Sequence, residues 1–202
     1  MPRSRDRNHV IPSRARPAGL RPACRPPRRV AATLLCGLAL LLAVGPASAR
    51  TIAVPEDHAT IRAAMSAAAA GDIILVGCGT YREHDLVVKA GVSLWSGTLQ
   101  PDCVTIDAQG RGRVLIFQPG TEAASVVGLT LRGGRSDGDG GAILCQDTAP
   151  RLARCNVLDS RARRGGGLYV GGDAAPVLED CVIRGNTALL HGGGVAWNTP
   201  AS

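Results

Sequence analysis

Two carboxylates lie close together in the polar stretch Ser-Asp-Gly-Asp-Gly, residues 136–140. Asp137 and Asp139 could supply oxygen ligands to a calcium ion. Arg132 and Arg135 lie nearby, and a basic side chain could take the proton next to a carboxyl group. The stretch is also typical of a solvated turn, and two carboxylates are few for an ion that takes about six to eight oxygen ligands. We therefore keep these two aspartates as metal candidates only and assign no metal, catalytic residue or cofactor.

Hydrolysis of a glycosidic bond needs two carboxyl groups that flank the bond. The sequence has no Asp-Asp pair and no Asn-Thr-Asp segment. Its only His-Gly pair, His191-Gly192, opens a run of glycines that predicts a turn. These patterns argue against a hydrolase of the polygalacturonase kind.

Cysteines form the third group of candidates. Five of them follow residue 49: Cys78, Cys103, Cys145, Cys155 and Cys181. The odd number argues against a complete disulfide framework, and no pair or cluster has the spacing of a zinc site. We predict buried thiols in the core. A disulfide between Cys78 and Cys103, which are 25 residues apart, stays an open hypothesis that an oxidising compartment would permit.

A repeat of about 26 residues organises the second half of the chain. Aligning residues 126–134, 152–160 and 178–186 gives three apolar columns: Val126/Leu152/Leu178, Leu129/Cys155/Cys181 and Leu131/Val157/Ile183. Glycine-rich stretches at 140–145, 165–170 and 192–197 recur at spacings of 25 and 27 residues. Pro150 and Pro176 repeat at 26 as well, each before a predicted strand, where a missing N–H does least harm.

The period predicts the architecture. Each repeat offers only short strands with alternating apolar residues, which cannot bury one face unless they stack on neighbouring repeats. Helical solenoids need two helices per repeat, and the glycine triplets leave no room for them. We therefore predict an all-β, right-handed parallel β-helix. Its stacked coils, about 4.8 Å apart, should place Leu129, Cys155 and Cys181 in one ladder.

The residues before the repeat fit the start of such a solenoid. Residues 50–71 are predicted to hold a first strand, Thr51 to Val54, and a helix capped by Thr60 that runs through Ala70 and ends at Gly71. Its apolar face should plug the open core: Ile61, Ala64, Met65 and Ala68. Further strands are predicted at residues 73–76, 86–88, 92–95, 104–106 and 114–117. Residues 72–198 should then form about four to five coils.

Several motifs carry a resemblance. They are Val-Pro-Glu-Asp-His-Ala-Thr-Ile-Arg-Ala-Ala (54–64), Gly-Asp-Ile-Ile-Leu-Val (71–76), Gly-Thr-Tyr-Arg-Glu (79–83) and Gly-Leu-Thr-Leu-Arg-Gly-Gly (128–134). Together with the glycine-rich repeats, they resemble pectin-lyase-like right-handed β-helix proteins over nearly all of residues 51–198. The resemblance implies this fold, whereas it says little about activity, because one fold can host many functions.

Pectin methylesterases of this kind carry Gly-x-Tyr-x-Glu near their start, which Gly79, Tyr81 and Glu83 match. Gln146-Asp147-Thr148 is similar to a second motif of these enzymes. The segment Asp-Phe-Ile-Phe-Gly, which supplies their carboxylate, is missing. We therefore transfer no catalytic residue from the family.

The first 49 residues are predicted to be a signal peptide with a long basic start. Residues 1–29 hold nine of the 23 basic and one of the 16 acidic side chains. The apolar run Val30 to Val44 is shorter than the roughly 20 residues of a membrane span, and Ala47-Ser48-Ala49 suits cleavage. An uncleaved anchor is the alternative. The remaining chain has 14 basic and 15 acidic side chains, so a nucleic-acid partner loses its support. We expect export to the periplasm, cell surface or medium, with no stable membrane span after cleavage.

The predicted function is that of a structural or carbohydrate-binding module without its own catalytic site. The aromatic content is 2%, and core packing explains Trp95, Tyr169 and Trp197 about as well as sugar binding does. The alternative is a fragment of a polysaccharide-active enzyme, pectate-lyase-like or esterase-like, whose active site is missing. No capping segment follows residues 195–198. We therefore expect a truncated chain that associates with itself through an open C-terminal coil.

Overall fold

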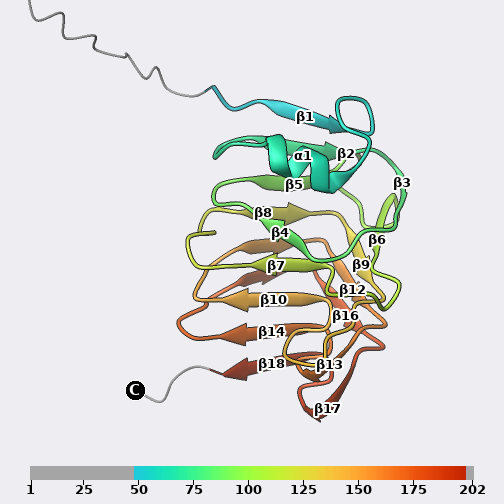
Figure 1. Ribbon diagram of the computed structural model, residues 1–202, viewed down its shortest axis with the longest axis vertical. Helices are drawn as coiled ribbons and strands as arrows, with labels where there is room; N and C mark the ends of the chain where they lie inside the picture. Colours follow the sequence, from blue (N-terminus) through green and yellow to red (C-terminus); the bar gives the residue numbers. More distant parts are fainter. Residues whose placement is uncertain (1–47, 199–202) are drawn as a thin grey trace, which may run out of the picture. The chain divides into compact units, whose positions relative to one another are not determined.

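A computed structural model describes residues 48–198, and these residues form a parallel β-solenoid (Figure 1). Three sheets run along the solenoid, and we name them A, B and C. Their strands stack coil upon coil, and every pairing between them is parallel. The predicted signal peptide lies outside the described residues except for Ser48 and Ala49. Within residues 48–198, no helix has the length and apolar character that a membrane crossing requires.

The three sheets differ in the number of their strands. Sheet A has six: β1 (Thr51–Val54), β2 (Ile73–Val76), β5 (Ser93–Ser96), β8 (Ser125–Val127), β11 (Arg151–Ala153) and β15 (Val177–Glu179). Sheet B has five: β3 (Gly79–Tyr81), β6 (Val104–Asp107), β9 (Thr130–Arg132), β12 (Asn156–Leu158) and β16 (Val182–Arg184). Sheet C has five: β4 (Leu86–Val88), β7 (Leu115–Phe117), β10 (Ile143–Gln146), β14 (Leu168–Gly171) and β18 (Val195–Asn198). A small extra pair comprises β13 (Arg161–Arg164) and β17 (Thr187–His191).

The solenoid has six coils when β1 is counted, and residues 72–198 form five of them, at the upper end of the expected four to five. Paired positions along sheet A are separated by 22, 20, 32, 26 and 26 residues. Only the last two separations are equal, which is why the sequence reveals a period in the C-terminal coils alone. In the first coil, β1 leads directly into a helix instead of strands of sheets B and C.

The repeat columns predicted from the sequence are confirmed. Leu152 pairs with Val126 on one side and with Leu178 on the other. The Asn156 N–H donates to the Leu129 carbonyl, and the Val182 N–H donates to the Cys155 carbonyl, both at 2.9 Å. These bonds place Leu129, Cys155 and Cys181 in consecutive positions of one ladder. Pro150 and Pro176 directly precede β11 and β15, as expected.

Left-handed residues form the corners of each regular coil. The three corners have positive φ at the following sets: Gly128/Arg154/Asp180, Gly133/Asp159/Gly185 and Gly140/Gly165/Gly192. At Gly165 a Cβ atom would lie 2.4 Å from the carbonyl oxygen of Leu168. Glycine is therefore required there both by conformation and by the close approach of backbone.

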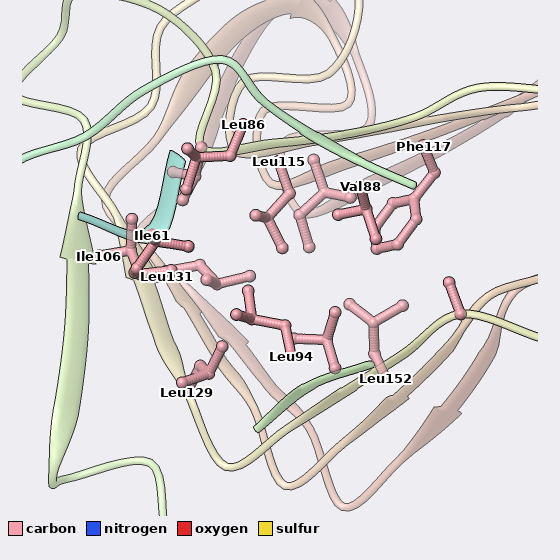
Figure 2. Close-up of a cluster of buried hydrophobic side chains, with 14 of the residues drawn as sticks. Ile61, Leu86, Val88, Leu94, Ile106, Leu115, Phe117, Leu129, Leu131 and Leu152 are labelled. Atoms are coloured by element: carbon pink, nitrogen blue, oxygen red, sulfur yellow. The ribbon is translucent and has the colours of Figure 1, made fainter. Parts of the chain in front are cut away.

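Apolar side chains of all three sheets meet inside the coils (Figure 2). Sheet A contributes Leu94 and Leu152, sheet B contributes Ile106 and Leu131, and sheet C contributes Leu115. All of them are fully buried. The alternation along each strand directs the neighbouring residues outward, where a ligand can reach them.

Helix α1 (Ile61–Ala67) covers the N-terminal end of this core and packs against β1, β2 and β4 (Figure 1). The predicted cap is confirmed, since the Ala63 N–H donates to the Thr60 hydroxyl at 3.1 Å. The predicted apolar face is also buried, as Ile61 and Met65 illustrate. The helix therefore plugs the core as the sequence suggests.

The helix ends at Ala67, earlier than the predicted Ala70. The Lys89 ammonium donates to the carbonyls of Ser66 and Ala68 at 2.6 and 2.9 Å. The Asp72 carboxylate accepts the Ala69 N–H at 2.9 Å. These contacts satisfy the last backbone groups of the helix and hold the following residues in a turn, which apolar periodicity does not reveal.

The last coil exposes apolar side chains. The large exposed residues of this coil have exposed fractions of 36–64%: Val177, Leu178, Val182, Leu189, Leu190 and Trp197. Leu178 follows the buried Leu152 in its column, and Trp197 follows the buried Val170. Both are thus core positions that no further coil covers within residues 48–198.

Candidate functional site

The Gly-x-Tyr-x-Glu segment has a structural role. The Tyr81 hydroxyl donates to the carbonyl of Gly77 at 3.0 Å. The Glu83 carboxylate accepts the N–H groups of Ile61 and Arg62 at 2.8 and 2.9 Å. Glu83 therefore caps the N-terminus of α1 from the next coil, because the first N–H groups of a helix lack partners within it. Tyr81 thus stabilises a turn of its own coil, and Glu83 fastens α1 to that coil.

Gln146, Asp147 and Thr148 also stabilise a corner. The Gln146 amide donates to Asp147 at 3.0 Å, and Asp147 accepts the Asp173 N–H at 3.0 Å. These hydrogen bonds lower the pKa of Asp147. The hydroxyls of Thr148 and Thr121 share a buried hydrogen bond of 2.7 Å. Each side chain thus has a partner in the solenoid itself.

The calcium and lyase candidates are not gathered into one site. Both oxygens of Asp139 accept hydrogen bonds from Arg164, at 2.8 and 2.6 Å. Arg132 donates twice to one oxygen of Asp107, at 3.0 and 2.8 Å. Across the described part of the chain, no three His, Cys, Asp or Glu side chains gather closely enough to hold a metal ion.

Asp137 and Arg135 lie together in a second place. They line a hollow of about 110 Å³ with Ser136, Arg161 and Leu189. Arg135 and Arg161 are neighbours on adjacent coils. Asp137 is a single exposed carboxylate in a hollow that two arginines also line, and the positive charges of these arginines disfavour a cation there.

The three aromatic candidates differ in their surroundings. Tyr169 is buried, and the Arg164 guanidinium lies 5.2 Å from the centre of its ring. Trp197 occupies a core column at the last coil. Trp95 instead lies on the outer face of sheet A, because its neighbour Leu94 points into the core.

A chain of hydrogen bonds orients the Trp95 ring. The indole N–H donates to the Ser125 hydroxyl on the neighbouring strand at 3.0 Å. The Ser125 hydroxyl in turn donates to Ser93 at 2.9 Å. The half-buried ring is therefore held in one orientation against the sheet, which is the condition for a preorganised contact with a ligand.

A hollow of about 200 Å³ opens beside this ring. Its lining comes from three stacked strands and two corners: Trp95, Leu99, Val127, Arg151 and Arg154. Ligand sites typically combine such an apolar lining with a few polar groups. The volume is below the roughly 300–1,000 Å³ of sites for drug-sized ligands. The hollow therefore suits one ring of a larger molecule.

One wall of the hollow is a loop that departs from the repeat. Eight residues, 96–103, separate Trp95 from Val104, whereas Gly128 alone separates Val127 from Leu129. The Thr130 hydroxyl donates to the Pro101 carbonyl at 2.6 Å and ties the loop to the next coil. The added loop thus builds a concave surface on an otherwise regular sheet.

A disulfide holds the end of the same loop. Cys103 is bonded to Cys78, with their Cα atoms 4.7 Å apart. The structure thus contains the bridge that the spacing of these cysteines left as a hypothesis. It joins two adjacent coils beside the corner that leads into sheet B.

The loop presses closely on the coil below it. A Cβ atom at Gly128 would lie 2.4 Å from the carbonyl carbon of Leu99. Leu99 itself has a φ of 56°, which is rare for a bulky residue. Backbone strain of this kind persists only where surrounding contacts impose it, and it is frequent at binding sites.

Two arginines form the polar edge of the hollow. Arg151 pairs with Glu179, with 3.1 Å between Nε and Oε1. Arg154 occupies the corner that Gly128 and Asp180 occupy in the neighbouring coils, and its side chain is exposed. An exposed guanidinium can donate several hydrogen bonds to hydroxyl or carboxylate oxygens.

Sequence reasoning considered Trp95 but missed the other residues of the hollow. Two signals could have pointed to them. The chain between Trp95 and Val104 is longer than its counterparts, and a corner that Gly128 and Asp180 hold in the neighbouring coils carries an arginine. Both are departures from a repeat, and they become visible only when the register of all coils is known.

Comparison with known proteins gives no relative. No protein-family model, no curated protein and no solved structure matches the chain. The resemblance to pectin-lyase-like proteins therefore rests on the quoted sequence motifs, whereas the structure shows a parallel β-solenoid.

Proposed function

We propose that this chain is an exported, pectin-lyase-like β-helix module that binds polysaccharide on the outer face of sheet A. The observation that supports this function best is the hollow beside Trp95, which combines an oriented indole ring with Arg154 at its edge. The basic and apolar leader supports export. The disulfide between Cys78 and Cys103 agrees with an oxidising compartment.

Binding uses two kinds of contact. The C–H face of a sugar ring packs on the indole, because aromatic side chains join a large apolar surface to a polar edge. Arg154 donates hydrogen bonds to the oxygens of the same sugar or of its neighbour. A polymer that follows the solenoid axis meets outward side chains of successive coils, about 4.8 Å apart.

The state of the carboxylates supports binding rather than cleavage. A general acid for glycoside chemistry needs a raised pKa. Partial burial raises the pKa of Asp107, but hydrogen bonds from Arg132 and from the Gln109 N–H outweigh this, and the pKa is lowered overall. Asp107 is therefore not prepared to give a proton to a leaving group. Both carboxylate oxygens of Asp139 accept hydrogen bonds from Arg164, so they already have partners within the solenoid.

The test is binding to a panel of neutral and acidic plant and bacterial polysaccharides by affinity electrophoresis. The chain is expressed with its leader, and Trp95→Ala is compared with Trp197→Ala, since Trp197 is exposed outside the hollow. We expect at least one polysaccharide to retard the wild type, with roughly tenfold weaker binding for Trp95→Ala. Equal binding by both variants would overturn the proposed site, and failure of every polysaccharide would overturn the function.

The same samples test the alternative of an enzyme fragment. Incubation with each polysaccharide is followed by assays for new reducing ends and for released methanol. We expect neither product. Their appearance in wild type, and their loss in Asp139→Asn, would favour catalysis over binding.

A further inference from the structure

Three cysteines stand apart from the proposed binding site. Cys145 and Cys155 are buried, and Cys181 is half-buried; none of them is in a disulfide. Cys145 belongs to sheet C, whereas Cys155 and Cys181 belong to one ladder beside sheet B. The last two therefore form a pair, and Cys145 is a natural internal control.

Cys155 and Cys181 lie at equivalent positions on two adjacent coils, one above the other. Asn156 pairs with Val182, so the two cysteines occupy equivalent positions one residue earlier on each strand. The Cys155 thiol lies 3.5 Å from the Val126 carbonyl oxygen. The Cys181 thiol lies 3.5 Å from the carbonyl oxygen of Leu152, which is the equivalent residue. The two side chains thus have the same orientation.

The distance between neighbouring coils suits a disulfide bond between Cys155 and Cys181. Neighbouring parallel strands lie about 4.8 Å apart, and disulfides bridge Cα atoms about 4.4–6.8 Å apart. The chain already contains such a bridge between adjacent coils, since the Cα atoms of Cys78 and Cys103 are 4.7 Å apart. Little backbone movement would be needed to join the second pair.

The two thiols also differ in reactivity. A hydrogen bond between them lowers the pKa of Cys181 and raises that of Cys155, and burial raises the latter further. Burial alone raises the pKa of Cys145 to about 12. Because the thiolate is the nucleophile, Cys181 should react first and Cys145 should stay inert.

We propose that Cys155 and Cys181 are a thiol–disulfide exchange site that closes a second bridge between coils, with a small-molecule or protein disulfide as the oxidant. The Cys181 thiolate attacks one sulfur of the donor disulfide and releases the first donor thiolate. Cys155 then loses its proton to this thiolate and attacks the Cys181 sulfur, which expels the second donor thiolate; this thiolate takes up from solvent the proton that Cys181 had released. The cysteine pair loses two electrons and two protons, and the donor disulfide becomes two thiols.

The bridge would fasten the last described coil to the coil before it. Cys181 lies between β15 and β16, which carry exposed apolar residues, whereas Cys155 is fully buried. A disulfide between them limits how far the two segments can move apart when the chain unfolds, which reduces the conformational entropy of the unfolded state. We expect the bridged form to melt roughly 5–10 °C higher than the dithiol form.

The experiment uses the wild-type chain and oxidised glutathione as the donor. Thiols are counted before and after treatment, and the unreduced digest is examined by mass spectrometry. Among Cys145, Cys155 and Cys181, we expect the number of free thiols to fall from three to one, with a cross-linked peptide that contains Cys155 and Cys181 and with Cys145 still free. If all three thiols stay free after treatment of the folded protein, the proposal is overturned.

Matched variants give the order of events. In Cys155→Ser, Cys181 should accumulate as a mixed disulfide with glutathione, whereas Cys145→Ser should form the bridge as wild type does. A persistent Cys181–glutathione adduct in the wild type would also contradict the proposal, because it would show that Cys155 does not reach it. Circular dichroism confirms that each variant is folded, and the outcome is independent of polysaccharide binding.

Discussion

The N-terminal and C-terminal coils of this solenoid are built differently. Positions along sheet A are separated by 22, 20 and 32 residues in the first coils and by 26 and 26 in the last. The regular coils stack equal columns of side chains, as Leu152 does on Val126. The irregular coils add a helix and the loop 96–103. The proposed binding hollow lies where the two parts meet, since Trp95 and Leu99 come from the irregular coils and Arg154 from the regular ones.

The first and last coils of residues 48–198 also differ in how their core is covered. At the N-terminal end, α1 covers the core and is capped by Glu83 and Lys89 from neighbouring elements. In the last coil, Leu178 and Trp197 are exposed core positions. Regular stacking can continue indefinitely, whereas an end needs a different element. Departures from the repeat therefore supply both the cover of the core and the candidate site.

The largest loss of stability should come from replacing a glycine of the regular coils. At Gly141 a Cβ atom would lie 2.1 Å from the carbonyl oxygen of Gly166, whereas at Gly138 its nearest neighbours would be 3.7 Å away. We expect Gly141→Ala to lower the free energy of unfolding by about 3 kcal/mol and Gly138→Ala by less than about 0.5 kcal/mol. Urea denaturation measures both. Equal stability of the two variants would refute the close stacking of these coils.

Removing the disulfide tests how much it contributes to the stability of the irregular coils and to binding. Replacing both Cys78 and Cys103 by serine removes a cross-link over 25 residues and frees the end of the loop beside Trp95. We expect a loss of about 2–3 kcal/mol in urea denaturation, together with weaker binding of polysaccharide. The Cys145→Ser variant keeps the bridge and is the control for binding. Unchanged binding by the double serine variant would show that the loop does not contribute to the binding site.

The exposed end gives a smaller effect. We propose that chains associate through the last coil, where Leu189 and Leu190 are more than half exposed. Leu190→Lys should weaken association about tenfold in sedimentation equilibrium, because the charge would be buried in the contact. Val87→Lys, at an exposed position of an early coil, is the matched control. Monomers of wild type at all concentrations would contradict this proposal.

The smallest effect is a pH dependence of the N-terminal end. The Ala69 N–H and then Arg50 donate to Asp72 and lower its pKa to about 2. A carboxyl with a lowered pKa stabilises the fold above its unfolded pKa, and this stability is lost as the pH falls toward 2. Asp72→Asn should therefore be less stable than wild type at pH 6, with a difference that shrinks from pH 4 to pH 2. Thermal unfolding of wild type and variant at several pH values measures this difference, and a difference that stays constant from pH 6 to pH 2 would contradict the prediction.

The regular part of the fold could be predicted because equal columns leave a period in the sequence. Leu129, Cys155 and Cys181 lie in one ladder for that reason. The strand β3 was missed, since three residues that include Gly79 and Thr80 have no clear alternation. The end of α1 was predicted too late, because Lys89 is far away in the sequence.

Most residues of the candidate site could not be predicted from the sequence. Whether Trp95 points inward or outward depends on its pairing with Val127, 32 residues later. The 26-residue repeat does not extend to this pair of strands, so the sequence does not reveal their register. The position of Arg154 depends on the same register. Pairings between distant strands decide which face a side chain occupies, and a shift of one residue reverses the answer.

The most direct test of the binding surface uses the two tryptophans of the chain as reporters. Trp197→Phe leaves Trp95 as the only source of indole fluorescence, and Trp95→Phe leaves Trp197. Each variant is titrated with the polysaccharide that retards the wild type most strongly. We expect a saturable change of emission in Trp197→Phe and none in Trp95→Phe. A saturable change in Trp95→Phe, with a flat titration of Trp197→Phe, would place the ligand at the last coil and contradict the site on sheet A.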